Sequence, residues 1–502
     1  MREEHDLAPD RSFDGGDLDC GNGLLLLIRR HIDPMAPGEL LEILSRESSV
    51  EEDLPAWCRL TGNALVSFAR RGEVRSYLVE KAPAAAAAGA PPRSVAPAGA
   101  ASPPPTMVAP EEAVVAPPEI APLSAMAIGS WPRPPWMLRA IHARTEGRMD
   151  EAEFRHTAED AMRLVIAAQR DAGVDVVTDG EQSRDSYASF VGARLENTQL
   201  IPLADLSAMV EDPDEFRREL AALDVPAHEV RHPVAFGPIR RTRPLVLDEL
   251  RFARRATELP VKVALPGPYL LARTMWLDCL LERAYPTREA LADDLVTVLR
   301  EEVADLLRAG AALVQFDEPV LTEVVFTGAK ARRSFMCGSA QREGRGAGRA
   351  GLRRRALARV ASGFPRAPRG PRLPRQLDEG RGGLLAGDYR PLLPYLREAA
   401  VGTLFLEFDA AGGEISVLGE LDDRHRIGLG VVNPRADRIE SVEEISAGPR
   451  GADLVGADRL LLNSDCGFAT FADNPVASSD IATEKLRRIA SAAAILRDEA
   501  GI

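Results

Sequence analysis

Short apolar segments rich in β-branched residues recur along the chain, and each ends on a polar side chain. These runs are 174–178, 312–316, 403–406, 427–432 and 460–463. The polar residues at their ends are Asp179, Glu181, Asp317, Glu318, Glu407, Asn433, Asp465 and Cys466. Continuous apolar runs are typical of buried parallel strands, and barrel enzymes carry their chemistry at the carboxyl ends of such strands. The pattern predicts an α/β fold, a (β/α)8 TIM barrel. The alternative is an ordinary α/β domain whose strands merely end on polar residues.

The N-terminal part of the chain has a different pattern. Over residues 12–81 the order reads strand, helix, strand, helix and two strands, with helices expected at 24–32 and 54–60 and a strand at 39–44. This order predicts a small α+β two-layer sandwich domain that precedes the barrel.

Residues 82–122 consist mostly of Ala and Pro and lack apolar periodicity. Such a segment cannot bury enough surface to offset its ordering entropy, so it is predicted to be a disordered linker. The large domain then covers residues 123–502.

Composition narrows the range of partners. The 502 residues are 45% hydrophobic and 27% charged, with a formal net charge of -14, and the runs of apolar residues are too short to span a bilayer. Nucleic acids and anionic membranes call for a concentrated basic face, so small substrates are expected. Because no apolar run is long enough for a membrane span, a cytoplasmic location is expected. The five cysteines are irregularly spaced, which favours thiol or metal chemistry over a disulfide framework.

The N-terminal domain resembles the TusA-type sulfur carriers. The residues that carry this resemblance are Leu18-Asp19-Cys20, the helix start at 51–58 and Thr61-Gly62-Asn63. The resemblance implies that Cys20, at a helix N-terminus, carries a persulfide for sulfur-relay proteins. The Cys-Pro-x-Pro motif of that family is replaced by Cys-Gly-Asn-Gly at 20–23, so a docking domain without sulfur chemistry is the alternative. Cys58 is expected in the core.

The large domain resembles the catalytic barrel of cobalamin-independent methionine synthase and its thiol-alkylating relatives. Several motifs occur in the order of that family: Gly129-Ser130-Trp131-Pro132-Arg133-Pro134, Asp179-Gly180-Glu181, Gly267-Pro268, Gln315-Phe316-Asp317-Glu318-Pro319, Leu406-Glu407 and Asp465-Cys466-Gly467.

This resemblance implies zinc-dependent methyl transfer to the thiol of homocysteine, which forms methionine. The methyl donor would be methyltetrahydrofolate or a simpler donor such as a corrinoid or another protein. Zinc bound to a thiol deprotonates it and keeps the sulfur nucleophilic. Of the zinc ligands in the family, Glu407 and Cys466 are the matching Glu and second Cys. The alternative is that Glu407 is only a carboxylate at the end of a strand and that Cys466 is only a buried thiol.

The same resemblance implies a substrate-binding set. Ser130, Glu181 and Asp317 match positions that hold the amino-acid part of homocysteine, where carboxylates pair with its ammonium group. A salt bridge is the alternative for the two acids, and a helix N-cap is the alternative for Ser130. Trp276 could stack on a pterin or pack in the core. The catalytic proton donor is unassigned, because Asn433 stands where the family often has a histidine.

Two expected zinc ligands, a His-x-Cys pair, are missing from the sequence. They should fall between Asp317 and Glu407, yet no histidine occurs between His232 and His425. Residues 339–383 are Arg-, Gly- and Pro-rich, and this segment is either a basic patch or a misread frame. With permitted codons, a one-base shift of 371–377 translates as His-Val-Cys-Arg-Gly-Asn-Trp. We therefore predict frameshifts over 339–383 and 446–456, and poor zinc binding by the printed chain.

Two other functions remain open at the level of the sequence. One is alkyl transfer to another thiol, such as coenzyme M. The other is a non-catalytic sulfur-relay or scaffold protein, which would follow if the zinc site is lost.

Overall fold

The computed structural model describes residues 5–16, 24–47, 50–72, 74–82, 118–145, 147–186, 188–202, 231–276, 285–318, 390–408, 415–421, 423–451, 455–469, 472 and 475–502. Contacts divide the chain into two compact units, one with strands β1 to β4 and one with the elements from β5 onward. No helix in these ranges is long and apolar enough to cross a membrane.

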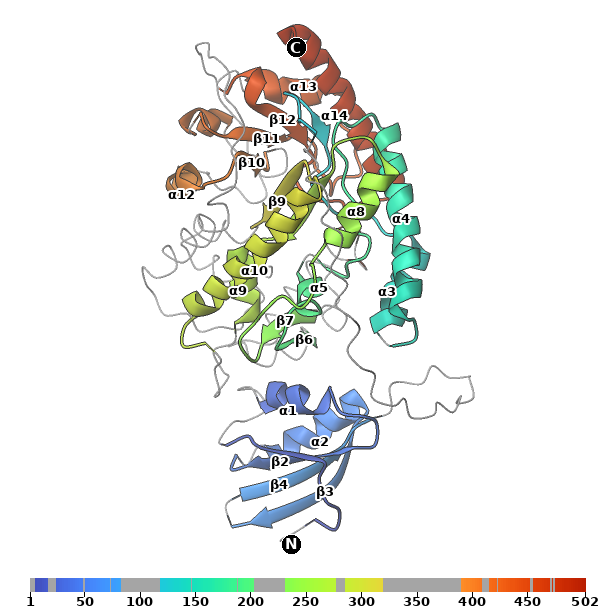
Figure 1. Ribbon diagram of the computed structural model, residues 1–502, viewed down its shortest axis with the longest axis vertical. Helices are drawn as coiled ribbons and strands as arrows, with labels where there is room; N and C mark the ends of the chain where they lie inside the picture. The colour runs from blue at the N-terminus through green and yellow to red at the C-terminus, as the bar shows by residue number, and fades with distance from the viewer. Residues whose placement is uncertain are drawn as a thin grey trace. The chain divides into compact units, whose positions relative to one another are not determined.

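The N-terminal unit is a four-stranded sheet with two helices (Figure 1). Along the chain its elements are β1 (Arg11–Asp14), α1 (Leu25–Ile32), β2 (Leu40–Ser45), α2 (Val50–Thr61), β3 (Ala64–Arg71) and β4 (Val74–Glu80). The strand order is β1-β2-β4-β3, with β1 parallel to β2 and the other pairs antiparallel. The predicted order of strands and helices is confirmed, although α2 begins four residues earlier than expected.

The two helices bury apolar residues at helical spacing. Leu24, Ile28 and Ile32 are fully buried, and so are Val50 and Leu54. The spacing of four residues places each set on one face of its helix, toward the sheet. Trp57 and Cys58 extend the buried face of α2, so the expected core position of Cys58 is confirmed. Cys20 lies outside the described residues.

The second unit is built around parallel strands. They are β5 (Ala125–Met126), β8 (Lys262–Pro266), β9 (Leu313–Asp317), β10 (Thr403–Leu406), β11 (Arg426–Gly430) and β12 (Leu460–Asn463). One sheet has the order β10-β11-β12-β5, and β8 pairs with β9. Parallel bridges from Met126 to Val176 and from Val177 to Val261 join the two sheets through the segment at 174–178. Each of the five predicted runs therefore contributes to one continuous parallel arrangement.

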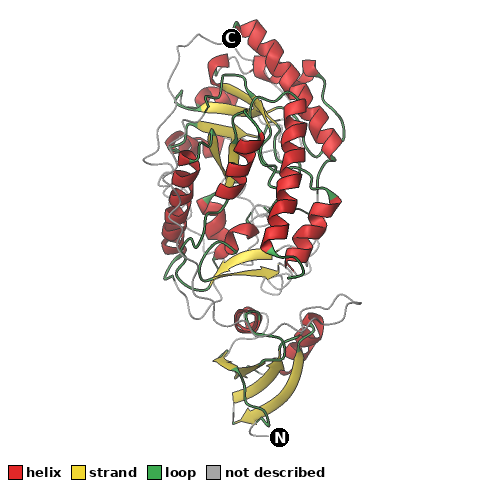
Figure 2. Cartoon of the chain, turned by 45° about the vertical axis from the view of Figure 1, so that its right-hand side comes forward, coloured by secondary structure: helices red, strands yellow, loops and turns green. Residues whose placement is uncertain are grey.

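Helices alternate with these strands and lie outside them (Figure 2). They are α3 (Pro135–Thr145), α4 (Glu151–Asp171), α5 (Ser189–Gly192), α8 (Leu247–Ala256), α9 (Pro268–Met275), α10 (Arg288–Arg308), α12 (Leu393–Glu398), α13 (Val442–Gly451) and α14 (Ser479–Ala500). Short 3-10 turns occupy Arg390–Leu392, Ile415–Glu420 and Ala457–Arg459, and β6 (Thr198–Pro202) pairs antiparallel with β7 (Arg231–Ala235). The side chains of Asp150, Thr287 and Ser478 cap α4, α10 and α14.

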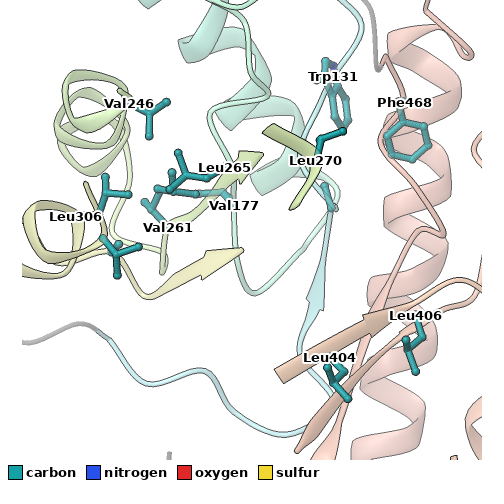
Figure 3. Packing of buried hydrophobic residues seen from close by; sticks show 14 of the residues in the cluster. Trp131, Val177, Val246, Val261, Leu265, Leu270, Leu306, Leu404, Leu406 and Phe468 are labelled. Atoms are coloured by element: carbon teal, nitrogen blue, oxygen red, sulfur yellow. The ribbon is translucent and has the colours of Figure 1, made fainter. Parts of the chain in front are cut away.

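The core of this unit lies between the strands and the helices. Val177, Val261 and Leu265 from the strands pack in one cluster with Val246 and Leu306 from the helical layer (Figure 3). Strands β8 and β12 are buried along their whole length, which explains why their sequences do not alternate between apolar and polar residues.

The two segments with a predicted frameshift differ in what the structure describes. Residues 339–383 lie outside the described part. Residues 446–451 belong to helix α13, which contains Pro449. A helix therefore forms there in the printed frame, and helix formation gives no support to the second frameshift.

Glu318 caps the N-terminus of α9 from the end of β9. Its carboxylate accepts hydrogen bonds from Tyr269 N at 2.8 Å and Leu270 N at 2.9 Å. The first amides of a helix have no partner within the helix, and the positive end of the helix dipole favours an anion. Any side chain at Gly267 would collide with this carboxylate, which explains the glycine.

Replacing Glu318 by Gln should destabilise the barrel by about 1 kcal/mol, the usual contribution of a cap. Chemical unfolding followed on the barrel transition measures this change. Glu289→Gln in the exposed first turn of α10 is the matched control, because Thr287 already caps that helix. Equal effects of the two substitutions would show that the hydrogen bonds of Glu318 to α9 contribute nothing specific.

Candidate functional site

Polar side chains gather where the parallel strands end. Glu181 follows the segment at 174–178, Asp317 ends β9, Glu407 follows β10 and Cys466 follows β12. Their charges influence one another: Asp317 raises the pKa of Glu181, and Glu407 and Asp317 both raise the pKa of Cys466. The structure therefore brings four of the predicted site residues into one electrostatic neighbourhood.

Glu181 is held by a tight turn with an unusual backbone. Gly180 and Glu181 have φ angles of 67° and 56°, which is common for glycine and rare for glutamate. A Cβ at Gly180 would collide with Val165 and Trp131. The amide of Glu181 donates to Asp179 Oδ1 at 3.2 Å. Left-handed backbone at a non-glycine residue often occurs at functional sites, where the surrounding structure fixes a side chain in one direction.

The carboxylate of Glu181 is buried within the site. The side chain lies over Gly129, where any Cβ would collide with it. Burial raises the pKa of Glu181 to about 7, although the guanidinium of Arg184 opposes this shift. Glu181 therefore titrates close to neutral pH.

Two buried arginines support Glu181, and neither was predicted from the sequence. Arg133 donates to the carbonyl of Glu181 at 2.7 Å and to the carbonyl of Ala469 at 3.1 Å, which joins two strand-end loops. Arg184 Nη1 lies 3.8 Å from Glu181 Oε2, and Arg184 Nη2 lies 3.5 Å from Asp179 Oδ2. The only sequence signal was their closeness to the motifs around 129–134 and 179–181.

Asp317 forms part of a hydrogen-bonded row inside the barrel. Lys262 Nζ donates to Gln315 Oε1 at 2.8 Å, and Gln315 Nε2 donates to Asp317 Oδ1 at 2.6 Å. Burial raises the pKa of Asp317, while the hydrogen bond from Gln315 and the charge of Lys262 lower it. The row places Lys262 beneath the carboxylates. Burial lowers the pKa of Lys262 to about 7, and the charges of Asp317 and Glu181 oppose this shift.

Ser130 lies beside the loop that carries Cys466. Its carbonyl accepts from Phe468 N at 2.9 Å, and its Oγ accepts from Ala469 N at 3.4 Å. A side chain at Gly467 would collide with Ser130 Oγ. Helix α3 begins only at Pro135, so Ser130 is not its N-cap, and that alternative reading of the sequence is wrong.

Glu407, Asp465 and Cys466 form the other side of the site. Asp465 accepts from Phe408 N at 2.9 Å, and its own amide donates to Val432 O at 3.0 Å, so it ties together the ends of three strands. Glu407 is open to solvent, yet partial withdrawal from water and the Asp465 carboxylate raise its pKa to about 7. Burial, and then Glu407, raise the pKa of Cys466 to about 12.

This donor set does not complete a zinc site. A thiol and a carboxylate are suitable ligands, but catalytic zinc takes at least three protein ligands. In the part of the chain that the structure describes, no group of three His, Cys, Asp or Glu side chains could hold a metal. The pKa of the Cys466 thiol is raised, because burial and the negative charge of Glu407 outweigh the positive charge of Arg435.

The remaining predicted residues have less defined places. Trp276 follows α9 and is buried in the hydrophobic core, in agreement with the core-packing alternative, and its stacking on a pterin stays a prediction. Asn433 shapes a turn through a bond from Arg435 N at 2.9 Å. An amide cannot supply a proton at neutral pH, so the catalytic acid remains unassigned.

Comparison with known families gives two matches. The profile of the family "Cobalamin-independent synthase, Catalytic domain" matches residues 123–343 and 388–494. The profile "Sulfurtransferase TusA" matches residues 23–81, which begin after Cys20. The break in the first match, 344–387, nearly coincides with the Arg-rich segment at 339–383.

Individual relatives agree with this result. A methionine synthase of Sulfolobus acidocaldarius is 24% identical over 383 residues, which cover 76% of this chain and 94% of the relative. A 5-methyltetrahydropteroyltriglutamate–homocysteine methyltransferase of Nitratidesulfovibrio vulgaris is 25% identical over 350 residues, 69% of this chain but 39% of the relative. A solved B12-independent methionine synthase from Shewanella sp. W3-18-1, in complex with selenomethionine, superposes with a TM-score of 0.52 at 22% identity, over 76% of this chain and 99% of that one. The predicted fold, a TIM barrel preceded by a small α+β domain, is confirmed.

Proposed function

Because the chain belongs to the family of the cobalamin-independent synthase catalytic domain, we propose that its barrel binds homocysteine and receives a methyl group on the homocysteine thiol, forming methionine. The sulfur–carbon bond forms as the carbon–nitrogen bond of a methylated folate breaks, and the released nitrogen takes up a proton. The folate donor is supported by the name of the relative from Nitratidesulfovibrio vulgaris.

The main supporting observation is a pair of carboxylates in the neighbourhood of the Cys466 thiol. The charge of Asp317 raises the pKa of Glu181 and that of Cys466, and both carboxylates lie near Lys262 and Arg184. Two carboxylates brought together repel each other, and a ligand cation relieves that repulsion. The ammonium group of an amino acid is such a cation, and its side-chain sulfur would then extend toward Cys466 and Glu407.

This geometry favours homocysteine over coenzyme M. Coenzyme M carries a sulfonate and no amino group, so the carboxylates of Glu181 and Asp317 would repel it. Opposite charges attract and like charges placed together cost several kcal/mol at a desolvated interface, about enough to reject the wrong ligand.

A four-ligand zinc site would need two residues that the sequence in its printed frame does not contain. We propose that Glu407 and Cys466 are two of four ligands, and that the other two are the His and Cys of the shifted frame at 371–377. The break in the family match at 344–387 supports this proposal. If the printed frame is correct, a sulfur-relay or scaffold function is the preferred proposal over methyl transfer. The match to a sulfurtransferase profile supports that alternative.

Calorimetric titration of the full printed chain tests the substrate proposal without requiring metal. We expect L-methionine, the product, to bind in the barrel, and coenzyme M at the same concentration to bind at least about 10-fold more weakly, a difference of about 1.4 kcal/mol. Equal binding of both compounds, or binding of coenzyme M alone, would contradict the proposal.

A further inference from the structure

We infer that Lys262 is a positioning residue of the amino-acid pocket, which acts through Gln315 to fix how Asp317 meets the ammonium group of the substrate. This inference rests on the proposed function, and it adds a residue of the barrel interior to the binding machinery. The geometry that carries it is the continuous row from Lys262 through Gln315 to Asp317.

Lys262 is an unusual residue for its position. It lies on β8, and its side chain is 0% exposed. The interior layers of such barrels are usually filled by Val, Ile and Leu, and withdrawing an ammonium group from water is unfavourable. The ring of Phe405, whose centroid lies 4.6 Å from Nζ, recovers part of this cost. A leucine or methionine would fill this space without any cost, so packing alone does not explain a lysine.

The lysine determines the orientation of Gln315. The ammonium form of lysine can only donate hydrogen bonds, so the amide of Gln315 presents its oxygen to Nζ when Lys262 is protonated. The NH2 group then has to point the other way, where it donates to Asp317 Oδ1. The orientation of the Gln315 amide therefore follows from the chemistry of Lys262.

The orientation of the Gln315 amide determines how the carboxylate of Asp317 is bonded. Its Oδ1 is occupied by the amide, while among the described residues no hydrogen bond engages Oδ2. The positive charge of Lys262 also favours the ionised form of Asp317, against the effect of burial. Lys262 thus keeps one oxygen of Asp317 occupied through Gln315 and opposes protonation of the carboxylate, which leaves the second oxygen for a ligand ammonium group.

The test compares two ligands that differ only in the amino group, L-methionine and 4-(methylthio)butanoate, on the full chain. Lys262→Met removes the donor and the charge and keeps an apolar stem beside Phe405. We expect L-methionine to bind about 10-fold more weakly to this variant, and 4-(methylthio)butanoate to bind within about 2-fold of its original affinity, since only the ammonium contact is affected. A merely structural role would weaken both ligands equally.

Gln315→Glu is the second variant, and it decides the matter if Lys262→Met does not fold. Its carboxylate can pair with Lys262, so the burial of the lysine is preserved, but it cannot donate to Asp317. We expect the same selective loss for L-methionine. If either folded variant retains the preference of the original chain for L-methionine, the inference is overturned. If the original chain itself shows no such preference, the proposed function fails first, so the two failures are distinguishable.

Discussion

Replacing Glu181 by Gln should weaken the binding of L-methionine by about 100-fold. Removal of one partner from a buried charge pair costs about 2–5 kcal/mol, and each 1.4 kcal/mol corresponds to a factor of ten. The substitution keeps the size and shape of the side chain and removes only its charge. Calorimetric titration of the full chain gives the affinity.

The pH dependence gives a second readout of the same substitution. Because burial raises the pKa of Glu181 to about 7, its carboxylate is largely protonated below that pH and ionised above it. Only the ionised form attracts an ammonium group, so binding to the original chain should strengthen as the pH rises from about 6 to about 8. In the Glu181→Gln variant this dependence should be reduced but not abolished, because burial also lowers the pKa of the neighbouring Lys262 to about 7.

Stability separates this role from a structural one. Since burial outweighs the attraction of Arg184, the ionised Glu181 destabilises the fold above its folded pKa, and Glu181→Gln should unfold at no lower temperature at pH 8. Glu302→Gln is the matched control. Glu302 is also fully buried, pairs with Arg241 at 2.6 Å and accepts from two backbone amides, so its loss should lower stability and leave binding unchanged. The reverse result would show that Glu181 serves only the fold.

Restoring the shifted frame over 339–383 should raise the zinc affinity of the chain by at least about 1000-fold. We call this variant the frame-corrected chain. Four-ligand zinc sites bind with about 10–16 kcal/mol, so the loss of two ligands removes several kcal/mol. Of the four expected ligands, the printed frame keeps the two in the described part of the chain, Glu407 and Cys466. Competition with a chromophoric chelator measures the affinity, and elemental analysis gives the zinc content per chain.

Two controls accompany the zinc measurement. Cys466→Ser in the frame-corrected chain should lower the affinity by at least about 100-fold, because a thiolate ligand is lost. The nucleotide sequence of the gene across codons 330 to 460 shows whether a single-base error exists. If the printed chain, as purified, holds one zinc tightly, the proposed loss of the site is wrong.

Residue patterns predicted the strands and the small domain because buried segments are recognisable as runs of apolar residues. The runs at 403–406 and 460–463 coincide with β10 and β12, and the helix expected at 24–32 is α1 (Leu25–Ile32). The order of polar residues at strand ends was enough to place Glu181, Asp317 and Cys466 in one neighbourhood. These features depend on neighbours in the chain and on the regular geometry of the barrel.

Other features could not be predicted because they depend on contacts between distant segments. Lys262 stands next to β-branched residues, and nothing in the chain around it indicates that its side chain points into the barrel. The bonds of Arg133 to Glu181 and Ala469 join residues far apart in the sequence. The cap on α9 comes from Glu318, about fifty residues after the helix begins, whereas local capping rules consider only adjacent residues.

Methionine formation by the frame-corrected full chain tests the central claim most directly. The chain is loaded with zinc and supplied with methyltetrahydrofolate and L-homocysteine, and the printed chain is assayed beside it. We predict that the frame-corrected chain forms methionine, that the printed chain forms none above the uncatalysed rate, and that coenzyme M is not methylated. A frame-corrected chain that holds zinc but forms no methionine, or a printed chain that is equally active, would contradict this account.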